Sequence, residues 1–202
     1  MKNILLIIDP QNDFITGTLT VSGAKQKMMK LSNYIEEKGE LYDEIFITLD
    51  SHPKSHCSFK ENGGIWPEHC VFGSNGWTVP EYLKHALINH KNWSFYKKGE
   101  NSKIEEYSIF DAEIEGMNLT ECLQSYFKQD SDTFIDVCGI AGDYCVLETI
   151  KGLVKVVPVD KISVLEEFTA SIDGGEKIEN YLKENDINYI YDSSLNLEKY
   201  VR

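Results

Sequence analysis

The sequence predicts an α/β fold with a mainly parallel sheet of about six strands and helices on both faces. Short apolar runs alternate along the chain with segments of helical periodicity, an order that is typical of strand–helix–strand units. The first run, residues 3–8 (NILLII), is continuously apolar, which is typical of a strand buried on both faces of a parallel sheet. No repeat or linker interrupts the pattern, so residues 1–202 are expected to form a single domain.

Six short segments have the composition of strands. Each is rich in apolar or aromatic residues, and turn formers or charged residues flank them. Asp9-Pro10 ends the first segment, and Asp50 directly follows the second. In chain order the predicted strands are 3–8, 45–49, 93–96, 133–139, 161–165 and 187–191.

The segments between these strands carry helical spacing or helix-start signals. The first helix is predicted over residues 25–37, with the candidate inner-face residues Met28, Met29, Leu31 and Ile35. Pro80 suits the first turn of the next helix. Three further helices are predicted. One runs from a cap at Asn118 to about Phe127, and another covers residues 175–184. Between them, residues 143–145 open a helix with Leu147, Ile150 and Leu153 on one face.

Composition limits the classes of partner. The 202 residues are 42% hydrophobic and 26% charged, which is ordinary for a soluble domain with a sizeable core. The net charge of -13 argues against nucleic acid or an anionic membrane as partner, whereas a neutral or cationic small molecule meets no such repulsion. Five cysteines without regular spacing indicate a reducing compartment. The N-terminal apolar run is too short for a signal peptide, and a cytoplasmic protein is expected.

Polar residues follow the carboxyl ends of several predicted strands. Asp9, Asp50, Lys98 and the segment 139–145 all fall at such positions. Because open α/β sheets bind ligands beyond the carboxyl ends of their strands, we expect these residues to share one site.

Cys145 is the best candidate nucleophile, because it lies after a strand and at the predicted start of a helix. A helix N-terminus stabilises an anion and is expected to lower the thiol pKa, as is a nearby Lys98 ammonium. Asp9 can take the thiol proton, and the backbone N–H groups of Ala141 and Cys145 can form an oxyanion hole. Together these groups predict acyl transfer through sulfur.

Each of these residue types also has a purely structural interpretation. A cysteine near a helix start is often a small buried hydrophobe, and an aspartate at a strand end often only caps a helix or forms a turn. A lysine is usually a solvated surface charge, and Lys97 rather than Lys98 is an alternative for the functional cation.

The stretch from Asp50 to His69 predicts a metal site. It holds three of the five histidines, His52, His56 and His69, after the aspartate that ends a strand. Carboxylate oxygen with imidazole nitrogen suits one divalent ion, most readily zinc, with manganese or iron as alternatives. Two other interpretations stay open: loop histidines that only form hydrogen bonds, and a structural zinc site made by His52, His56, Cys57 and Cys70.

Taken together, these motifs resemble the nicotinamidases (pyrazinamidases) of the isochorismatase-like cysteine hydrolases, over nearly the whole chain to about residue 175. Four segments carry the resemblance in the family's order. They are DPQNDF at 9–14, the metal loop with Asp50-Ser-His52, His56-x-Ser58-Phe59 and Trp66-Pro-x-His69-Cys70, the lysine segment Lys98-Gly99 with Tyr107-Ser-x-Phe110, and the nucleophile segment Gly139-Ile-Ala-x-Asp143-x-Cys145.

The resemblance implies an amidohydrolase that converts nicotinamide to nicotinate and ammonia through a cysteine thioester, in NAD salvage. It implies a catalytic triad of Asp9, Lys98 and Cys145, and metal ligands Asp50, His52 and His69. It also implies a cis peptide bond before Ala141. The residues expected to line the substrate pocket are Phe14 and Trp66 as walls for a pyridine ring, with Tyr107 and Tyr144.

The sequence departs from the family pattern at two positions. Gly142 stands where threonine is frequent, and Ile109 where glycine is frequent, and either change is expected to affect the pocket or its loops. Some members have a fourth metal ligand in this loop, for which His56 and Glu61 are the candidates here. The sequence also allows a homo-oligomer.

Two rival functions stay open. One is another amidohydrolase of the same superfamily, acting on a carbamoyl or ureido compound. The other is a catalytically silent metal-binding protein on this fold.

Overall fold

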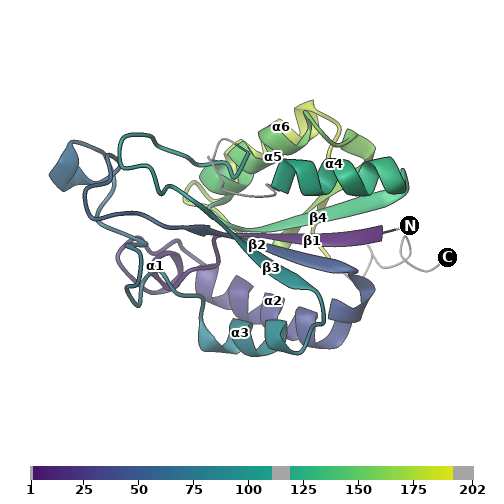
Figure 1. Cartoon of the computed structure of the whole chain (residues 1–202), viewed down its shortest axis with the longest axis horizontal. Helices are drawn as coiled ribbons and strands as arrows, with labels where there is room; N and C mark the ends of the chain where they lie inside the picture. The colour runs from purple at the N-terminus through teal and green to yellow at the C-terminus, as the bar shows by residue number, and fades with distance from the viewer. Residues whose placement is uncertain (1, 111–118, 193–202) are drawn as a thin grey trace.

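The computed structural model describes residues 2–110 and 119–192, which form one six-stranded sheet with helices on both faces (Figure 1). The strands lie in the order β3-β2-β1-β4-β5-β6, and every neighbouring pair is parallel. The predicted α/β fold class and strand number are therefore confirmed. The strands are β1 (Lys2–Ile8), β2 (Glu44–Asp50), β3 (Trp93–Lys98), β4 (Thr133–Ile140), β5 (Ile162–Ala170) and β6 (Asn188–Ile190).

Helices cover the two faces of this sheet, and none in the described parts is long and apolar enough to cross a membrane. Figure 1 shows α2 and α3 on one face and α4, α5 and α6 on the other. Each face buries its own apolar core, which contains alternate residues of β1 because successive strand residues point to opposite faces. The helices are α1 (Asn12–Ile15), α2 (Ala24–Lys38), α3 (Glu81–Ile88), α4 (Leu119–Gln129), α5 (Leu147–Leu153) and α6 (Glu176–Glu184).

The structure corrects several details of the predicted elements. β3 extends two residues beyond the predicted 93–96, so Lys98 is its last residue rather than part of the following loop, and β5 continues to Ala170. The short helix α1 was not predicted. Met29 is 49% exposed and does not belong to the inner face of α2, because it lies one residue off the buried stripe. The predicted cap Asn118 lies outside the described residues.

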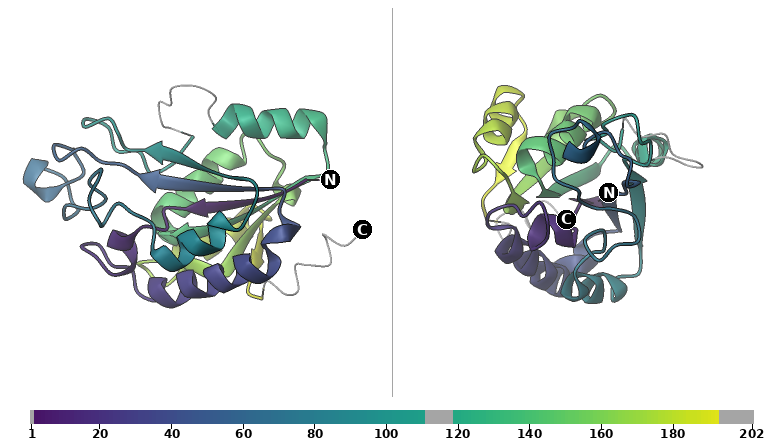
Figure 2. Two further views of the ribbon diagram at one scale, coloured as in Figure 1. Left: turned by 60° about the horizontal axis from the view of Figure 1, so that its bottom comes forward. Right: turned by 90° about the vertical axis from the view of Figure 1, so that its left-hand side faces the viewer.

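The carboxyl ends of β3, β2, β1 and β4, which are neighbours in the sheet, meet at one edge of it. Ile8 at the end of β1 pairs with Gly139 of β4, and Asp50 at the end of β2 pairs with Lys98 of β3. The long loops that follow β2 and β3 extend beyond this edge (Figure 2). This register places the predicted catalytic and metal-binding segments side by side.

Candidate active site and metal centre

The Lys98 ammonium lies at the centre of the site. Its Nζ is 2.8 Å from Asp9 Oδ2 and 3.5 Å from Cys145 Sγ, and it also forms an ion pair with the Asp50 carboxylate. The Lys98 side chain is fully buried. One buried cation therefore joins the predicted base, the predicted nucleophile and a predicted metal ligand. Lys97, the alternative, is partly exposed and pairs with Glu100.

Burial and charge oppose each other in this cluster. Burial raises the pKa of Asp9, the Lys98 ammonium lowers it and the Asp50 carboxylate raises it, with a net rise above the ordinary value. For Lys98, burial lowers the pKa, but Asp50 and Asp9 raise it well above the ordinary value. Lys98 is therefore a permanent cation, and the raised pKa makes the Asp9 carboxylate a stronger base than an ordinary aspartate.

Cys145 contradicts one expectation from the sequence. It lies within a short π-helical turn, Gly142–Val146, which precedes α5, so it does not occupy the first turn of a regular α-helix. Burial raises its thiol pKa well above the ordinary value, and Lys98 lowers it without reversing the shift. The predicted lowering of the pKa is therefore wrong: at neutral pH the thiol keeps its proton until a base removes it.

Asp50, His52 and His69 converge next to Lys98. Their candidate ligand atoms all lie within 4.8 Å of one another, and all three residues are buried. His52 Nδ1 lies 3.0 Å from the Gly99 carbonyl oxygen, and His69 Nδ1 lies 2.8 Å from that of Pro67. A carbonyl oxygen only accepts hydrogen bonds, so Nδ1 carries a proton in both rings, and Nε2 is the ring atom that can bind a metal.

This arrangement fits a divalent metal ion. Metal-binding histidines generally donate their second ring N–H to a carbonyl or carboxylate, as both rings do here. His52 Nε2 is buried and makes no close hydrogen bond among the described residues; its charged neighbour is Asp50 Oδ2 at 3.5 Å. An ion bound between these two atoms would satisfy both. One carboxylate with two imidazoles is a donor set suited to zinc and similar ions.

Charges in the site favour the metal-binding protonation states of Asp50 and His69, but they favour a proton on His52. Burial raises the pKa of Asp50, but Lys98 and His52 lower it far more, so it remains ionised. Burial lowers the pKa of His69. For His52, burial lowers the pKa but the Asp50 carboxylate raises it above the ordinary value, so binding of a cation to His52 must displace a proton.

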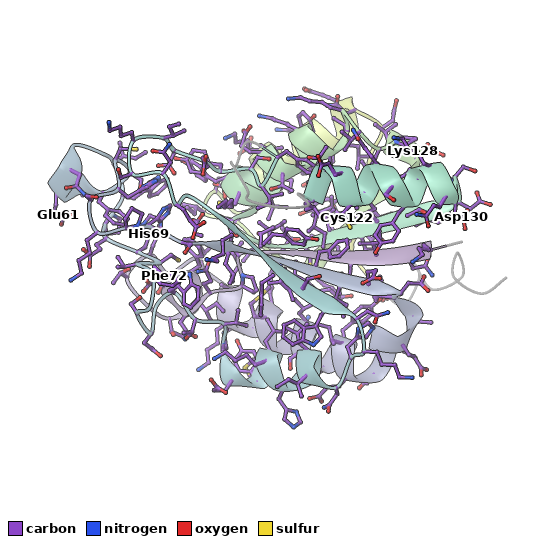
Figure 3. All side chains as sticks on the ribbon, viewed as in Figure 1. Glu61, His69, Phe72, Cys122, Lys128 and Asp130 are labelled. Carbon is purple, nitrogen blue, oxygen red and sulfur yellow. The ribbon has the colours of Figure 1, made fainter. Side chains whose placement is uncertain are left out.

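His56 and Glu61, the two candidates for a fourth metal ligand, do not join the group of Asp50, His52 and His69. His56 lies with Nδ1 2.7 Å from Ser58 Oγ and Nε2 3.0 Å from the Ile104 carbonyl oxygen, and burial lowers its pKa to about 4. Both of its ring nitrogens are thus engaged. Glu61 is exposed at the tip of the loop, away from His69 (Figure 3).

Glu105 is a residue of this region that the sequence did not single out. Its carboxylate groups with the ring nitrogens of His52 and His56, and it lines the cavity beside Cys145. It lies seven residues beyond Lys98 in a polar loop that gives no pattern by which to find it. Neither Cys57 nor Cys70 joins any candidate metal group among the described residues, so the alternative structural zinc site has no geometric support.

Aromatic side chains close over a cavity of about 30 Å³ next to Cys145. Trp66 Nε1 donates a hydrogen bond to the Tyr107 hydroxyl at 3.0 Å, and the Tyr144 ring lies 5.1 Å from the Trp66 ring. A larger groove of about 890 Å³ lies between α2 and α3, but its lining holds none of the predicted site residues. The cavity is lined by Phe14, Leu19, Val21, Asp50, Trp66, His69, Glu105, Tyr107, Ala141, Tyr144, Cys145 and Ile172.

The nucleophile segment has two features that bear on the family pattern. The peptide bond between Ile140 and Ala141 is cis, as the resemblance implies. A side chain at Gly142 would collide with Ser171 and lie 3.1 Å from Thr169 Cγ2, so glycine suits this packing. Neither Gly142 nor Ile109 lines the cavity; Ile109 is buried in the core beneath α4 and α5.

Comparisons with known proteins agree with this geometry. No family model matches the sequence. A nicotinamidase/pyrazinamidase of Mycobacterium tuberculosis is 33% identical over 188 residues, which cover 84% of this chain and 96% of that protein. Among solved structures, a pyrazinamidase of Pyrococcus horikoshii in complex with zinc has a TM-score of 0.73 and 26% identity, covering 94% of this chain and 99% of that one.

A second solved structure, of PnC1 from L. infantum in complex with nicotinate, has a TM-score of 0.78 and 28% identity, covering 96% of this chain and 93% of that one. The sequence identity and the nearly full coverage show that this chain belongs to the nicotinamidase/pyrazinamidase family.

Proposed function

We propose that this protein hydrolyses nicotinamide to nicotinate and ammonia through a cysteine thioester, in NAD salvage. The observation that carries the proposal is the buried Lys98 ammonium, which contacts Asp9, Cys145 and Asp50 at once. The cavity beside Cys145 is lined by aromatic rings, which suits a planar, neutral substrate. The related protein bound to nicotinate adds support.

The first half of the reaction forms the thioester. Asp9 removes the proton of the Cys145 thiol, and the thiolate attacks the carboxamide carbon. The developing oxyanion accepts hydrogen bonds from the backbone N–H groups of Ala141 and Cys145. Asp9 then returns the proton to the leaving nitrogen, the carbon–nitrogen bond breaks and ammonia departs.

The second half regenerates the enzyme. Asp9, ionised again, takes a proton from a water molecule that attacks the thioester carbonyl carbon. The carbon–sulfur bond breaks, nicotinate leaves, and the Cys145 thiol recovers its proton from Asp9. Lys98 stays charged throughout and balances the negative charge on Asp9 and on the thiolate.

Asp50, His52 and His69 would hold one divalent metal ion, with zinc as the first candidate and manganese or iron as alternatives. When bound, the ion supplies a Lewis acid at the cavity that can bind the pyridine nitrogen directly or through water. Phe14 and Trp66 would hold the ring, with Tyr107 and Tyr144 completing the walls. Positioning of this kind brings the carboxamide carbon toward Cys145.

Ammonia release from nicotinamide tests the proposal. Reduced, metal-replete wild type is expected to release ammonia, whereas Cys145→Ala is expected to be inactive. Cys138→Ala is the matched control, because Cys138 is also a buried cysteine but lies in β4 outside the site. No release by wild type would overturn the substrate, and full activity in Cys145→Ala would overturn the mechanism. If chelation leaves the nicotinamide affinity unchanged, the metal does not anchor the substrate ring.

A further inference from the structure

Asp13 is a buried carboxylate that the proposed chemistry does not use. It lies in α1 between the candidate base Asp9 and the ring wall Phe14, and is only 7% exposed. Its oxygens accept two backbone hydrogen bonds, Oδ2 from the Cys70 N–H at 2.7 Å and Oδ1 from the Thr18 N–H at 3.1 Å. Through the bond from Cys70, Asp13 ties α1 to the loop that holds His69.

Cys70 is the point at which this tie reaches the metal site. It directly follows His69 and has a φ of 46°, in the left-handed region that a residue with a side chain rarely adopts. Its N–H donates to Asp13, while its carbonyl oxygen accepts a hydrogen bond from the His52 N–H at 3.0 Å. The backbone of Cys70 therefore links the two candidate histidine ligands, and Asp13 holds that link in its unusual conformation.

The surroundings leave room for this carboxylate. A Cβ on Gly76 or on Gly17 would overlap the Asp13 carboxylate. The Gly76 carbonyl oxygen also accepts a hydrogen bond from the Asp13 N–H at 3.0 Å. The Thr18 hydroxyl donates to the Glu68 carbonyl oxygen at 2.6 Å, immediately before His69. With the bond from Cys70 to Asp13, these two hydrogen bonds fix loop residues 68–76 to α1 and to the turn that follows it.

We propose that Asp13 is a positioning residue for the metal centre. Its carboxylate fixes the backbone at Cys70 and thereby the orientation of His69 relative to His52. The inference rests on the metal centre of the proposed function. The amide of asparagine has only one oxygen to accept a hydrogen bond, and its NH₂ group faces the other backbone N–H, which is also a donor. Asp13→Asn therefore releases the loop without changing the size of the side chain.

Metal affinity measured without substrate tests this role. Metal-free wild type, Asp13→Asn, Gly76→Ala and Asp143→Asn are titrated with Co²⁺ by visible absorption and with Zn²⁺ in competition with a chromophoric chelator. Asp13→Asn is expected to bind either ion about 10- to 100-fold more weakly, as for other residues that orient metal ligands. Gly76→Ala is expected to show the same loss, because it displaces the carboxylate while keeping its charge.

Asp143→Asn is the matched control. Asp143 is also a buried carboxylate that accepts two backbone hydrogen bonds, from Ile172 and Asp173, but it does not contact the metal loop in any of these bonds. The Asp143→Asn variant is expected to have a lower melting temperature, as is Asp13→Asn, but its Co²⁺ affinity should equal that of wild type.

If Asp13→Asn and Gly76→Ala bind metal as tightly as wild type, the positioning role of Asp13 is overturned, but the metal centre is not. An equal loss of affinity in Asp143→Asn would also overturn it, since the effect would then be general destabilisation. Absence of Co²⁺ or Zn²⁺ binding by wild type would overturn the metal centre itself, and ammonia release from nicotinamide then shows whether the proposed hydrolysis falls with it.

Discussion

The Lys98 ammonium and the Asp9 carboxylate form a fully buried ion pair at 2.8 Å. The same ammonium holds the Asp50 carboxylate, so two buried anions depend on one cation. Breaking a buried pair by removing one partner leaves an uncompensated charge, which costs about 3–5 kcal/mol. Lys98 is therefore expected to matter for both folding and chemistry.

Lys98→Met is expected to lower kcat by about 10²- to 10⁴-fold, because proton transfer by Asp9 then lacks its charge partner. It is also expected to lower the free energy of unfolding. Lys97→Gln is the control, since Lys97 is the adjacent, partly exposed lysine, whose partners Glu100 and Phe72 are also exposed. Ammonia release and urea unfolding measure both effects. Near-wild-type turnover in a folded Lys98→Met protein would contradict the assigned role.

Strand ends were the part of the site that the sequence predicted well. Apolar runs identify buried strands, and the parallel arrangement then brings Asp9, Asp50 and Lys98 to one edge of the sheet. The end of β3 was predicted two residues early because its last residues, Lys97 and Lys98, are charged. Their extended conformation comes from pairing with β2, and a local pattern does not contain this pairing.

Burial depth was the part that the sequence could not predict. Position near a helix start predicted a lowered thiol pKa for Cys145, whereas burial raises it. Depth depends on how the loops after β2 and β3 fold over the sheet. Glu105 was missed for the same reason, because only the folded loop brings it to the cavity. Lone polar residues in a loop carry no periodicity from which to predict such contacts.

His56 is expected to make stability depend on pH. Burial lowers its pKa from 6.5 to about 4 in the folded protein, so between these values the unfolded state binds a proton that the folded state does not. The contribution of His56 to the free energy of unfolding is fully present above the pKa of the unfolded state, and it is lost as the pH falls through the pKa of the folded state.

The free energy of unfolding of the chelated protein should therefore fall between pH 6.5 and about 4. His56→Asn should make this fall shallower, as measured by urea unfolding at a series of pH values. His85→Gln removes a histidine at the surface and serves as the control. Parallel pH profiles for wild type and His56→Asn would contradict the prediction.

Gly99 is expected to strengthen metal binding by leaving room for the His52 ring. It has a φ of +73°, and a Cβ there would collide with the His52 ring, whose Nδ1 donates to the Gly99 carbonyl oxygen. Gly99→Ala should therefore weaken Zn²⁺ binding by about 10- to 100-fold, the range found when groups that orient metal ligands are disturbed.

Gly73→Ala isolates the effect of the collision. Gly73 has a φ of +80°, and a Cβ at this position would have no neighbouring atom of the described residues within 4 Å. Alanine there therefore meets only the backbone penalty of the left-handed region. Both variants should lose some stability, but only Gly99→Ala should lose Zn²⁺ affinity in a chelator competition. Equal affinities would show that the His52 ring tolerates displacement.

The hydrogen bond from Trp66 to Tyr107 is expected to hold the aromatic wall in place. Burial raises the Tyr107 pKa to about 12, so the hydroxyl stays protonated and accepts from Trp66 Nε1 at 3.0 Å. Tyr107→Phe keeps the ring and removes only this bond, which is worth about 0.5–1.5 kcal/mol. Because the wall holds the substrate ring in the proposed complex, KM for nicotinamide should rise about 2- to 10-fold, and kcat should change less.

Tyr191→Phe is the control, because the Tyr191 hydroxyl donates to Glu179 on the exposed surface. Steady-state kinetics and the difference in tryptophan emission between Tyr107→Phe and wild type report the two consequences, since a freed Trp66 indole should change its emission. A lower kcat with unchanged KM would instead place the Tyr107 hydroxyl in the chemical step, because an interaction made only in the transition state leaves substrate binding unaffected.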